Sequence, residues 1–164
     1  MKMAEQDKKA HLIELLRDFD TAMLVTTGQD GLVARPMALA EVADDAGLCF
    51  STSVDSPKVR EIEASPTVLV TLQSRTKFVS LRGRATVTRD RQLIERLYKE
   101  DWKIWFPGGK DDPTLGLIVV HADQGQFWDN SGKNGLVYVY RAAKAYLQGE
   151  KPETDGGQAA KVAL

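Results

Sequence analysis

The sequence predicts an α+β fold in which short antiparallel strands form a small β-barrel with helices between them. The expected elements follow the order helix, three strands, helix, two strands, helix and further strands. This order suits hairpins around one core, because a doubly wound parallel sheet needs a helix between most strands. A Gln-Asp-Gly turn at residues 29–31 predicts a tight hairpin. Gly83, in the middle of a long strand pattern, predicts the bulge or bend with which a sheet curls into a barrel.

The first half of the chain begins with a helix over residues 4–19. Its leucines at positions 12, 15 and 16, together with Phe19, recur at helical spacing and form one apolar stripe. Residues rich in β-branched side chains then predict strands. The expected strands of this half are residues 21–27, residues 32–41 and a third that begins at residue 48.

The second half begins with a helix over residues 56–64. Two strands, residues 67–73 and 77–88, and a helix capped by Asp90 and running to residue 99 are expected next. After an aromatic and turn-rich stretch come two strand segments, a short apolar segment and a closing helical turn; these are residues 115–120, 125–128, 136–140 and 141–147. The polar, Gly-rich end has little to bury and is expected to be disordered. We therefore expect one domain over residues 1–148 and a tail over residues 149–164.

Composition excludes several classes of function. The chain has 164 residues and a net charge of −1, which offers no general attraction to nucleic acid or to anionic lipid. A single cysteine, Cys49, excludes an intrachain disulfide, and with only two histidines it argues against a zinc site. No apolar run is long enough to span a bilayer. Because the charged N-terminus does not resemble a signal peptide, a cytoplasmic location is expected.

Residues 48–63 contain the main candidate site. Ser56-Pro57 is a typical start of a helix and places Lys58 in the first turn, where the helix dipole disfavours a cation. A lysine in that position is explained if an anion lies between it and the free amides and hydroxyls, so we hypothesise a phosphate pocket. The alternative is a solvated lysine on a well-capped helix. Arg35, on the second expected strand, is likewise open to interpretation as an ordinary surface charge.

Several motifs together resemble pyridoxamine 5'-phosphate oxidase-like flavoproteins. They are residues 34–37 (ARPM) with the hairpin before them, residues 50–52 (FST), residues 56–62 (SPKVREI) and residues 83–85 (GRA). Residues 105–109 (WFPGG) and 127–129 (FWD) are similar to the general stress protein 26 type. The resemblance covers roughly residues 10–140. It implies a six-stranded antiparallel split β-barrel of Greek-key type with flanking helices, present as a homodimer that binds FMN in two equivalent clefts at the subunit interface.

The resemblance also implies a set of cofactor-binding residues. Arg35 and Lys58 would neutralise the FMN phosphate, and Ser51 and Thr52 would donate hydroxyl hydrogen bonds to it. The remaining implied contacts surround the isoalloxazine ring: they are Pro36 and Met37 on the strand beside it, Phe78 where the oxidase has a Gln, Trp128 from the partner subunit, and Trp105.

One departure from the family pattern limits the functional expectation. The oxidase follows its Trp with an Arg-x-His segment that holds the substrate phosphate, whereas residues 129–133 (DNSGK) contain neither residue. Oxidation of pyridoxamine 5'-phosphate is therefore not expected, because a fold does not by itself specify a reaction. We expect an FMN-dependent oxidoreductase acting on an unidentified small molecule, with no catalytic residue assigned. The alternatives are a non-catalytic flavin-binding stress protein, acting as sensor or store, and a cleft that holds FAD, a deazaflavin or haem.

Overall fold

Six antiparallel strands form a closed barrel, and a seventh extends its sheet. The computed structural model describes residues 4–149 and 159–164. Its sheet has the order β3-β2-β1-β4-β5-β6-β7, and pairing of β3 with β6 closes the barrel. The strands are β1 Thr21–Gly28, β2 Gly31–Val42, β3 Leu48–Ser53, β4 Thr67–Gln73, β5 Lys77–Thr88, β6 Leu115–Asp129 and β7 Ala159–Ala163. The predicted α+β barrel is confirmed.

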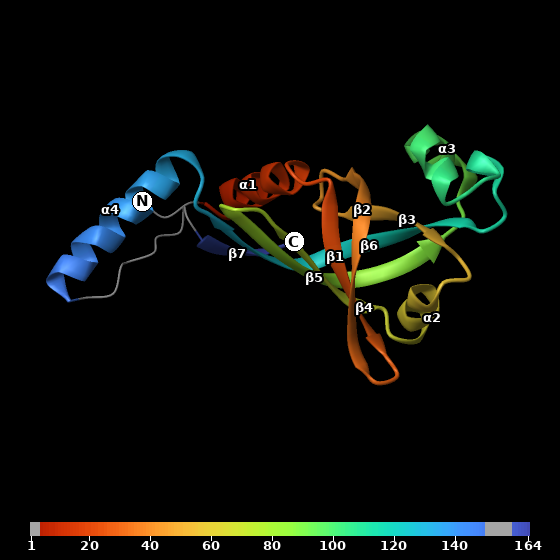
Figure 1. Cartoon of the computed structure of the whole chain (residues 1–164), viewed down its shortest axis with the longest axis horizontal. Helices are drawn as coiled ribbons and strands as arrows, with labels where there is room; N and C mark the ends of the chain where they lie inside the picture. The colour runs from red at the N-terminus through yellow and green to blue at the C-terminus, as the bar shows by residue number, and fades with distance from the viewer. Residues whose placement is uncertain (1–3, 150–158) are drawn as a thin grey trace.

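Helices surround the barrel and mark the two ends of the molecule's long axis. They are α1 Glu5–Arg17, α2 Pro57–Ala64, α3 Arg91–Leu97, α4 Gly132–Gln148 and the 3-10 helices η1 Glu100–Ile104 and η2 Gly109–Asp111. Figure 1 shows α3 at one end and α4 projecting from the other. No helix in the described ranges is long and apolar enough to cross a membrane.

The apolar core has two parts. The predicted stripe of α1 is buried against the barrel interior, which is filled from every strand. Its fully buried side chains include Leu24, Phe50, Val70, Leu81 and Phe127. A second cluster lies between β3, β6 and the layer of α3 and η1, and it buries Cys49, Trp102 and Phe106. Burial raises the pKa of the Cys49 thiol to about 11, so this residue is a core side chain and not a nucleophile.

The barrel bends at Gly83, as the sequence predicts. The register of β5 against β6 shifts between Arg82 and Gly83, which is the signature of a β-bulge. The side chain of Asp90 accepts hydrogen bonds from the amides of Gln92 and Leu93, which confirms the predicted cap of α3.

Three expectations for the C-terminal part are wrong. The two strand segments around residues 121–124 form one continuous strand, β6, because β3 pairs with its first half and β7 with its second. The short apolar segment and the closing turn are parts of one helix, α4. Residues 159–163, placed in the disordered tail, form β7, whose backbone bonds satisfy the edge of β6. The rest of that tail, residues 150–158, lies outside the described residues.

Candidate functional site

Arg35, on β2, is held by two partners from different elements. Its guanidinium donates from Nη1 to Thr26 Oγ1 at 2.6 Å and from Nη2 to Glu61 Oε2 at 2.7 Å. Thr26 also donates to Glu61 Oε2 at 2.5 Å, so β1, β2 and α2 meet in one hydrogen-bonded triangle. The side chains of Arg35 and Glu61 are only 20% and 18% exposed, and Thr26 is buried. Arg35 is therefore part of a built site and not an ordinary surface charge.

Lys58 lies beside this triangle without a carboxylate of its own. Lys58 is half-buried, and loss of solvent together with the positive charge of Arg35 lowers its pKa, an effect that Glu61 only partly offsets. Among the described residues, no ion pair includes Lys58. Hydrogen bonds from Thr26 and Arg35, with the nearby charge of Lys58, lower the pKa of Glu61 and keep it ionised. Two cations thus face one anion, and the cluster has an excess of one positive charge.

The hydroxyl residues of β3 divide between two faces. Thr52 is buried, and its Oγ1 donates to the carbonyl oxygen of Ser53 at 3.2 Å and lies 3.3 Å from Ser56 Oγ, at the start of α2. Successive side chains of a strand point to opposite sides, so Ser51 follows Cys49 away from the barrel interior. The predicted start of α2 is confirmed, but the Ser56 side chain accepts no amide, and its backbone carbonyl instead accepts a bond from Val59.

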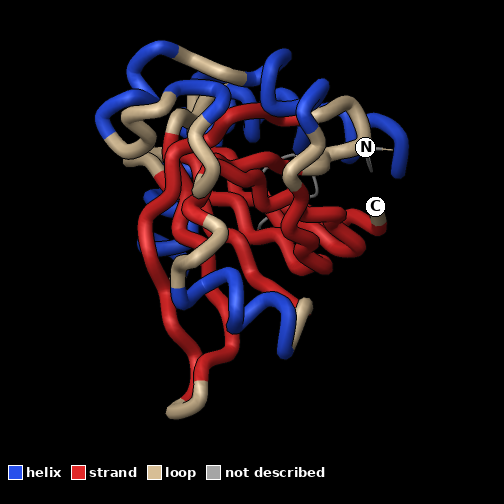
Figure 2. Tube along the Cα trace, turned by 90° about the vertical axis from the view of Figure 1, so that its right-hand side faces the viewer, coloured by secondary structure: helices blue, strands red, loops and turns tan. Residues whose placement is uncertain are grey.

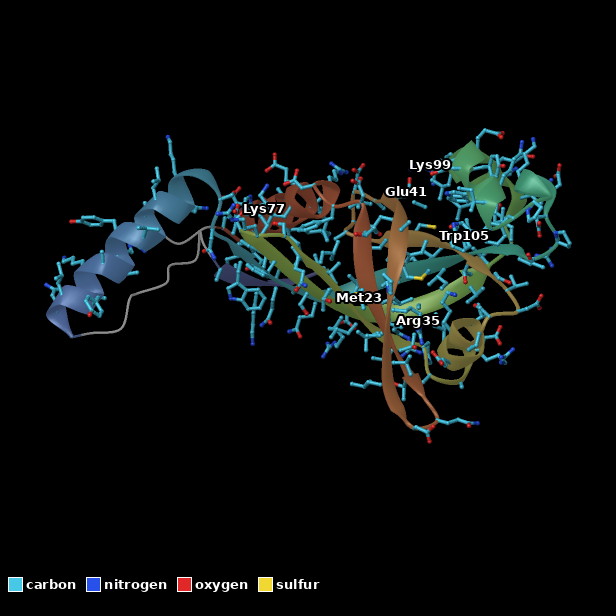
Figure 3. The ribbon with its side chains drawn as sticks, in the orientation of Figure 1. Met23, Arg35, Glu41, Lys77, Lys99 and Trp105 are labelled. Atoms are coloured by element: carbon cyan, nitrogen blue, oxygen red, sulfur yellow. The ribbon has the colours of Figure 1, made fainter. Side chains whose placement is uncertain are left out.

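The remaining predicted residues, apart from Met37, lie outside the barrel interior. The register places Phe78 directly opposite Trp128 on the outer face of the sheet, and Pro36 directly opposite Met23 on the same face. Met37 alternates to the inner face and packs against the core. Trp105 ends η1 and is 78% exposed. In Figure 3 the labelled Lys77, which precedes Phe78, and Trp105 lie toward opposite ends of the barrel.

We call the exposed side of this sheet the outer sheet face. Cross-strand pairing puts Met23, Thr71 and Ser80 side by side on it, and four of its large apolar side chains are more than a third exposed. They are Met23, Leu69, Phe78 and Trp128. Several large exposed apolar side chains on one sheet face indicate an interface.

Buried Asp129 fixes the end of the strand that carries Trp128. It accepts hydrogen bonds from the amide and hydroxyl of Ser131 at 2.9 and 2.5 Å, and His11 Nε2 lies 3.0 Å from its other oxygen. Burial raises the pKa of Asp129, but the bonds from Ser131 and the proximity of His11 outweigh burial and lower it. His11 itself packs edge-on against Phe127. The direction of Trp128 is therefore set by a network that reaches back to α1.

The sequence matches the profile of the family described as "Pyridoxamine 5'-phosphate oxidase like" over residues 7–153. The chain belongs to this family. Among the curated relatives of this pyridoxamine 5'-phosphate oxidase-like protein is Protein bli-3 of Neurospora crassa, 28% identical over 93% of this chain and 82% of the relative.

Solved structures support the same assignment. A protein described as general stress protein 26 of Jannaschia sp. CCS1 matches with a TM-score of 0.73 and 25% identity, and the match covers 98% of this chain and 100% of that chain. The general stress FMN/FAD binding protein of Xanthomonas citri matches with a TM-score of 0.68 and 28% identity, over 78% of this chain and 92% of that chain.

Sequence reasoning missed Thr26 and Glu61. Glu61 follows Lys58 by three positions on α2, a spacing that puts both on one helix face. This spacing is enough to indicate Glu61 as a neighbour of Lys58. Thr26 is polar at a strand position that the alternation of β1 makes inward-facing. Among the described residues, no cluster of His, Cys, Asp and Glu could hold a metal ion.

Replacing Glu61 with Gln is expected to lower the free energy of unfolding by roughly 1.5–3 kcal/mol, because a charge-assisted bond to mostly buried Arg35 is lost. Urea denaturation at pH 7 measures this change. Glu63→Gln, exposed on the same helix, is the matched control and should change little. The pKa of Glu61 is lowered in the folded state, below the usual glutamate range. The stability difference between the wild type and Glu61→Gln should therefore disappear as the pH falls through that pKa. Equal stability of Glu61→Gln and wild type at pH 7 would contradict the structural role of the triangle.

Proposed function

We propose that this protein binds FMN in a cleft shared by two copies of the chain and acts as a flavin-dependent oxidoreductase on a small molecule. The observation that carries the proposal is the position of Lys58, which is half-buried and which no described carboxylate pairs with as an ion pair of its own. Loss of solvent and the positive charge of Arg35 both lower its pKa. Burying a charge without a partner is costly. A ligand phosphate beside Lys58 and Arg35 would remove that cost.

The cluster suits a phosphate monoester in charge and in donors. Two cations with one carboxylate leave a deficit of one negative charge, which a phosphate group supplies with oxygens that accept several hydrogen bonds. Lys58 lies in the first turn of α2, where the partial positive charge of the helix end adds to the attraction. Thr52 contacts Ser56 and so lies beside the same end of α2. In this proposal its hydroxyl donates a hydrogen bond to the phosphate, as the family resemblance implies.

A shared cleft explains why the other predicted residues lie elsewhere on the chain. Phe78 and Trp128 form an exposed pair on the outer sheet face, whereas Arg35 and Lys58 lie on the inner side of β2 and on α2. Pairing of two copies through the outer sheet face would bury its apolar side chains, and it would allow each copy to present Trp128 to the cleft of the other. In this arrangement Arg35 and Lys58 hold the phosphate, while Phe78 and Trp128 exclude water from the ring.

Bound flavin supplies hydride or single-electron transfer, and the residues of this chain bind and orient it. The similar protein of Xanthomonas citri is described as an FMN/FAD binding protein, which supports the proposal that this chain binds a flavin. FAD is therefore the ligand to compare with FMN.

The proposal is tested by titrating the purified, flavin-free protein with FMN and with FAD, following flavin absorbance and fluorescence. We expect saturable binding of one FMN per chain and reduction of the bound flavin by a reduced nicotinamide nucleotide under anaerobic conditions. Tight binding with no reduction by any common donor would replace the oxidoreductase with the non-catalytic sensor or store. No spectral change with either flavin would overturn the proposal.

A further inference from the structure

Helix α4 presents its large apolar side chains to solvent. Positions 136, 140, 143 and 147 recur at spacings of four, three and four, so Leu136, Tyr140, Ala143 and Leu147 form one stripe, here called the α4 stripe. Leu136, Tyr140 and Leu147 are 74%, 70% and 84% exposed. Of the α4 residues whose side chains are described, Ala145 is the buried one, and it lies on the side opposite the stripe. Among the α4 side chains that the structure describes, a small one is therefore buried while large apolar ones are exposed, the reverse of an ordinary surface helix.

This arrangement requires a partner surface. An isolated helix of 17 residues is marginally stable in water, and most helical stability in proteins comes from packing an apolar face. Figure 1 shows α4 extending away from the barrel at the end opposite α2. Within the described residues, neither apolar cluster of the barrel includes a side chain of the α4 stripe.

The charge of α4 favours a second copy of the same chain as that partner. The helix contains Lys133, Arg141 and Lys144 and no acidic residue, which gives it a charge of +3. Since the whole chain has a net charge of −1, the rest of it carries −4. Another copy therefore offers α4 a body of opposite sign, and two such contacts related by a two-fold axis close a dimer.

A groove of matching character lies between the β1–β2 hairpin and α2, which project together from the barrel in Figure 2. Its volume is about 770 Å³, and we call it the hairpin groove. Val33, Pro57 and Ala64 give it apolar walls, and its polar lining includes the carboxylates of Asp30 and Glu61 and the guanidinium of Arg60. The apolar walls are what make this groove suitable for an apolar helix face.

Chain continuity brings the two surfaces together in the dimer proposed above. There, Trp128 of one copy lies in the cleft that holds Lys58 of the other, and α4 begins only four residues after Trp128, at most roughly 14 Å along the chain. Lys58 belongs to the same short helix as four of the groove residues, which are Pro57, Arg60, Glu61 and Ala64. The partner's α4 would therefore emerge beside the hairpin groove.

We propose that the α4 stripe of each chain docks in the hairpin groove of a second copy and closes the shared cleft from outside. This inference rests on the proposed shared-cleft dimer and goes beyond it, because it gives α4 a binding partner and the hairpin groove an occupant.

The decisive experiment mixes two single-substitution proteins, Tyr140→Cys and Val33→Cys, under mild oxidation. Because each protein carries only one of the introduced thiols, and Cys49 is buried in both, a disulfide between positions 140 and 33 can form only between different chains. We expect a cross-linked dimer from the mixture and none from either protein alone. Tyr140→Cys mixed with Ile104→Cys, an exposed position at the α3 end, is the control and should not cross-link.

A second measurement asks whether the stripe contributes to dimer affinity. Leu136→Glu is expected to raise the dimer dissociation constant in sedimentation at least about tenfold, whereas Gln148→Glu, with the same charge change outside the stripe, should not. A dimer that binds FMN but gives no 140–33 cross-link and no response to Leu136→Glu would overturn this inference and leave the proposed function intact. Stripe-dependent binding to phosphatidylserine vesicles without cross-linking would overturn it in favour of a membrane surface. A protein that is monomeric and binds no FMN would overturn both the proposed function and the docking of the α4 stripe.

Discussion

Replacing Lys58 with Met is expected to weaken FMN binding roughly 10- to 100-fold, the effect of losing a charge-assisted hydrogen bond worth about 1.5–3 kcal/mol. The same change should stabilise the flavin-free protein, because the folded chain holds the Lys58 ammonium against Arg35 with partial loss of solvent. Affinity and stability thus move in opposite directions, which an ordinary surface lysine would not produce. Flavin fluorescence titration measures the first change and urea denaturation the second.

The pH dependence of the stability difference between Lys58→Met and the wild type provides a second test. The folded-state pKa of Lys58 lies below the ordinary lysine value of 10.5, so the folded state disfavours the charged form. The destabilisation is complete below the folded-state pKa and fades as the pH rises from that pKa toward 10.5. The stability gain of Lys58→Met should therefore be present at pH 7 and shrink in alkaline solution. Lys99→Met, at an exposed position far from α2 in Figure 3, is the control; an equal effect of the two substitutions would contradict the phosphate pocket.

Replacing Gly83 with Ala is expected to lower the free energy of unfolding by about 3 kcal/mol or more, because the bulge leaves no room for a side chain. A Cβ at this position would overlap the carbonyl oxygen of His121 and lie 2.8 Å from Ala122 Cα. Both atoms belong to the backbone of β6, which cannot move without disturbing its pairing with β5 and β3. Thermal or urea denaturation measures the loss.

The control for Gly83→Ala is Arg84→Ala, an exposed neighbour on the same strand whose truncation should cost little. A wild-type midpoint for Gly83→Ala would show that β6 yields at the bulge. It would also remove the reason for a glycine at the point where the sheet curls into a barrel.

Local signals in the sequence were sufficient for much of the fold. The α1 stripe, the Asp90 cap and the position of α2 each depend on residues a few positions apart, and propensity and periodicity describe such spacings. Lys58 was recognised for the same reason, since a cation in a first helical turn is a local anomaly.

The remaining features depend on contacts that no local pattern encodes. The triangle of Arg35, Thr26 and Glu61 joins three elements, so its members could be seen individually but not as partners. Strand β7 consists mainly of alanines, and the free edge of β6 overrides their helix preference. The apolar residues at the start of α4 suit strand and helix alike, and the helix is distinguished only by its continuation through the alanines that follow.

The shared cleft is the central claim, and complementation between two variants with weakened FMN binding tests it most directly. Lys58→Met and Trp128→Ala each damage every cleft in their own dimers. If one copy supplies Lys58 and the other Trp128, a mixed dimer contains one cleft in which both residues are intact. After equal amounts of the two variants are unfolded and refolded together, about a quarter of all clefts should regain wild-type FMN affinity in a fluorescence titration. A mixture in which every site keeps the affinity of the two parent variants would show that each chain builds its site alone, and it would contradict the account.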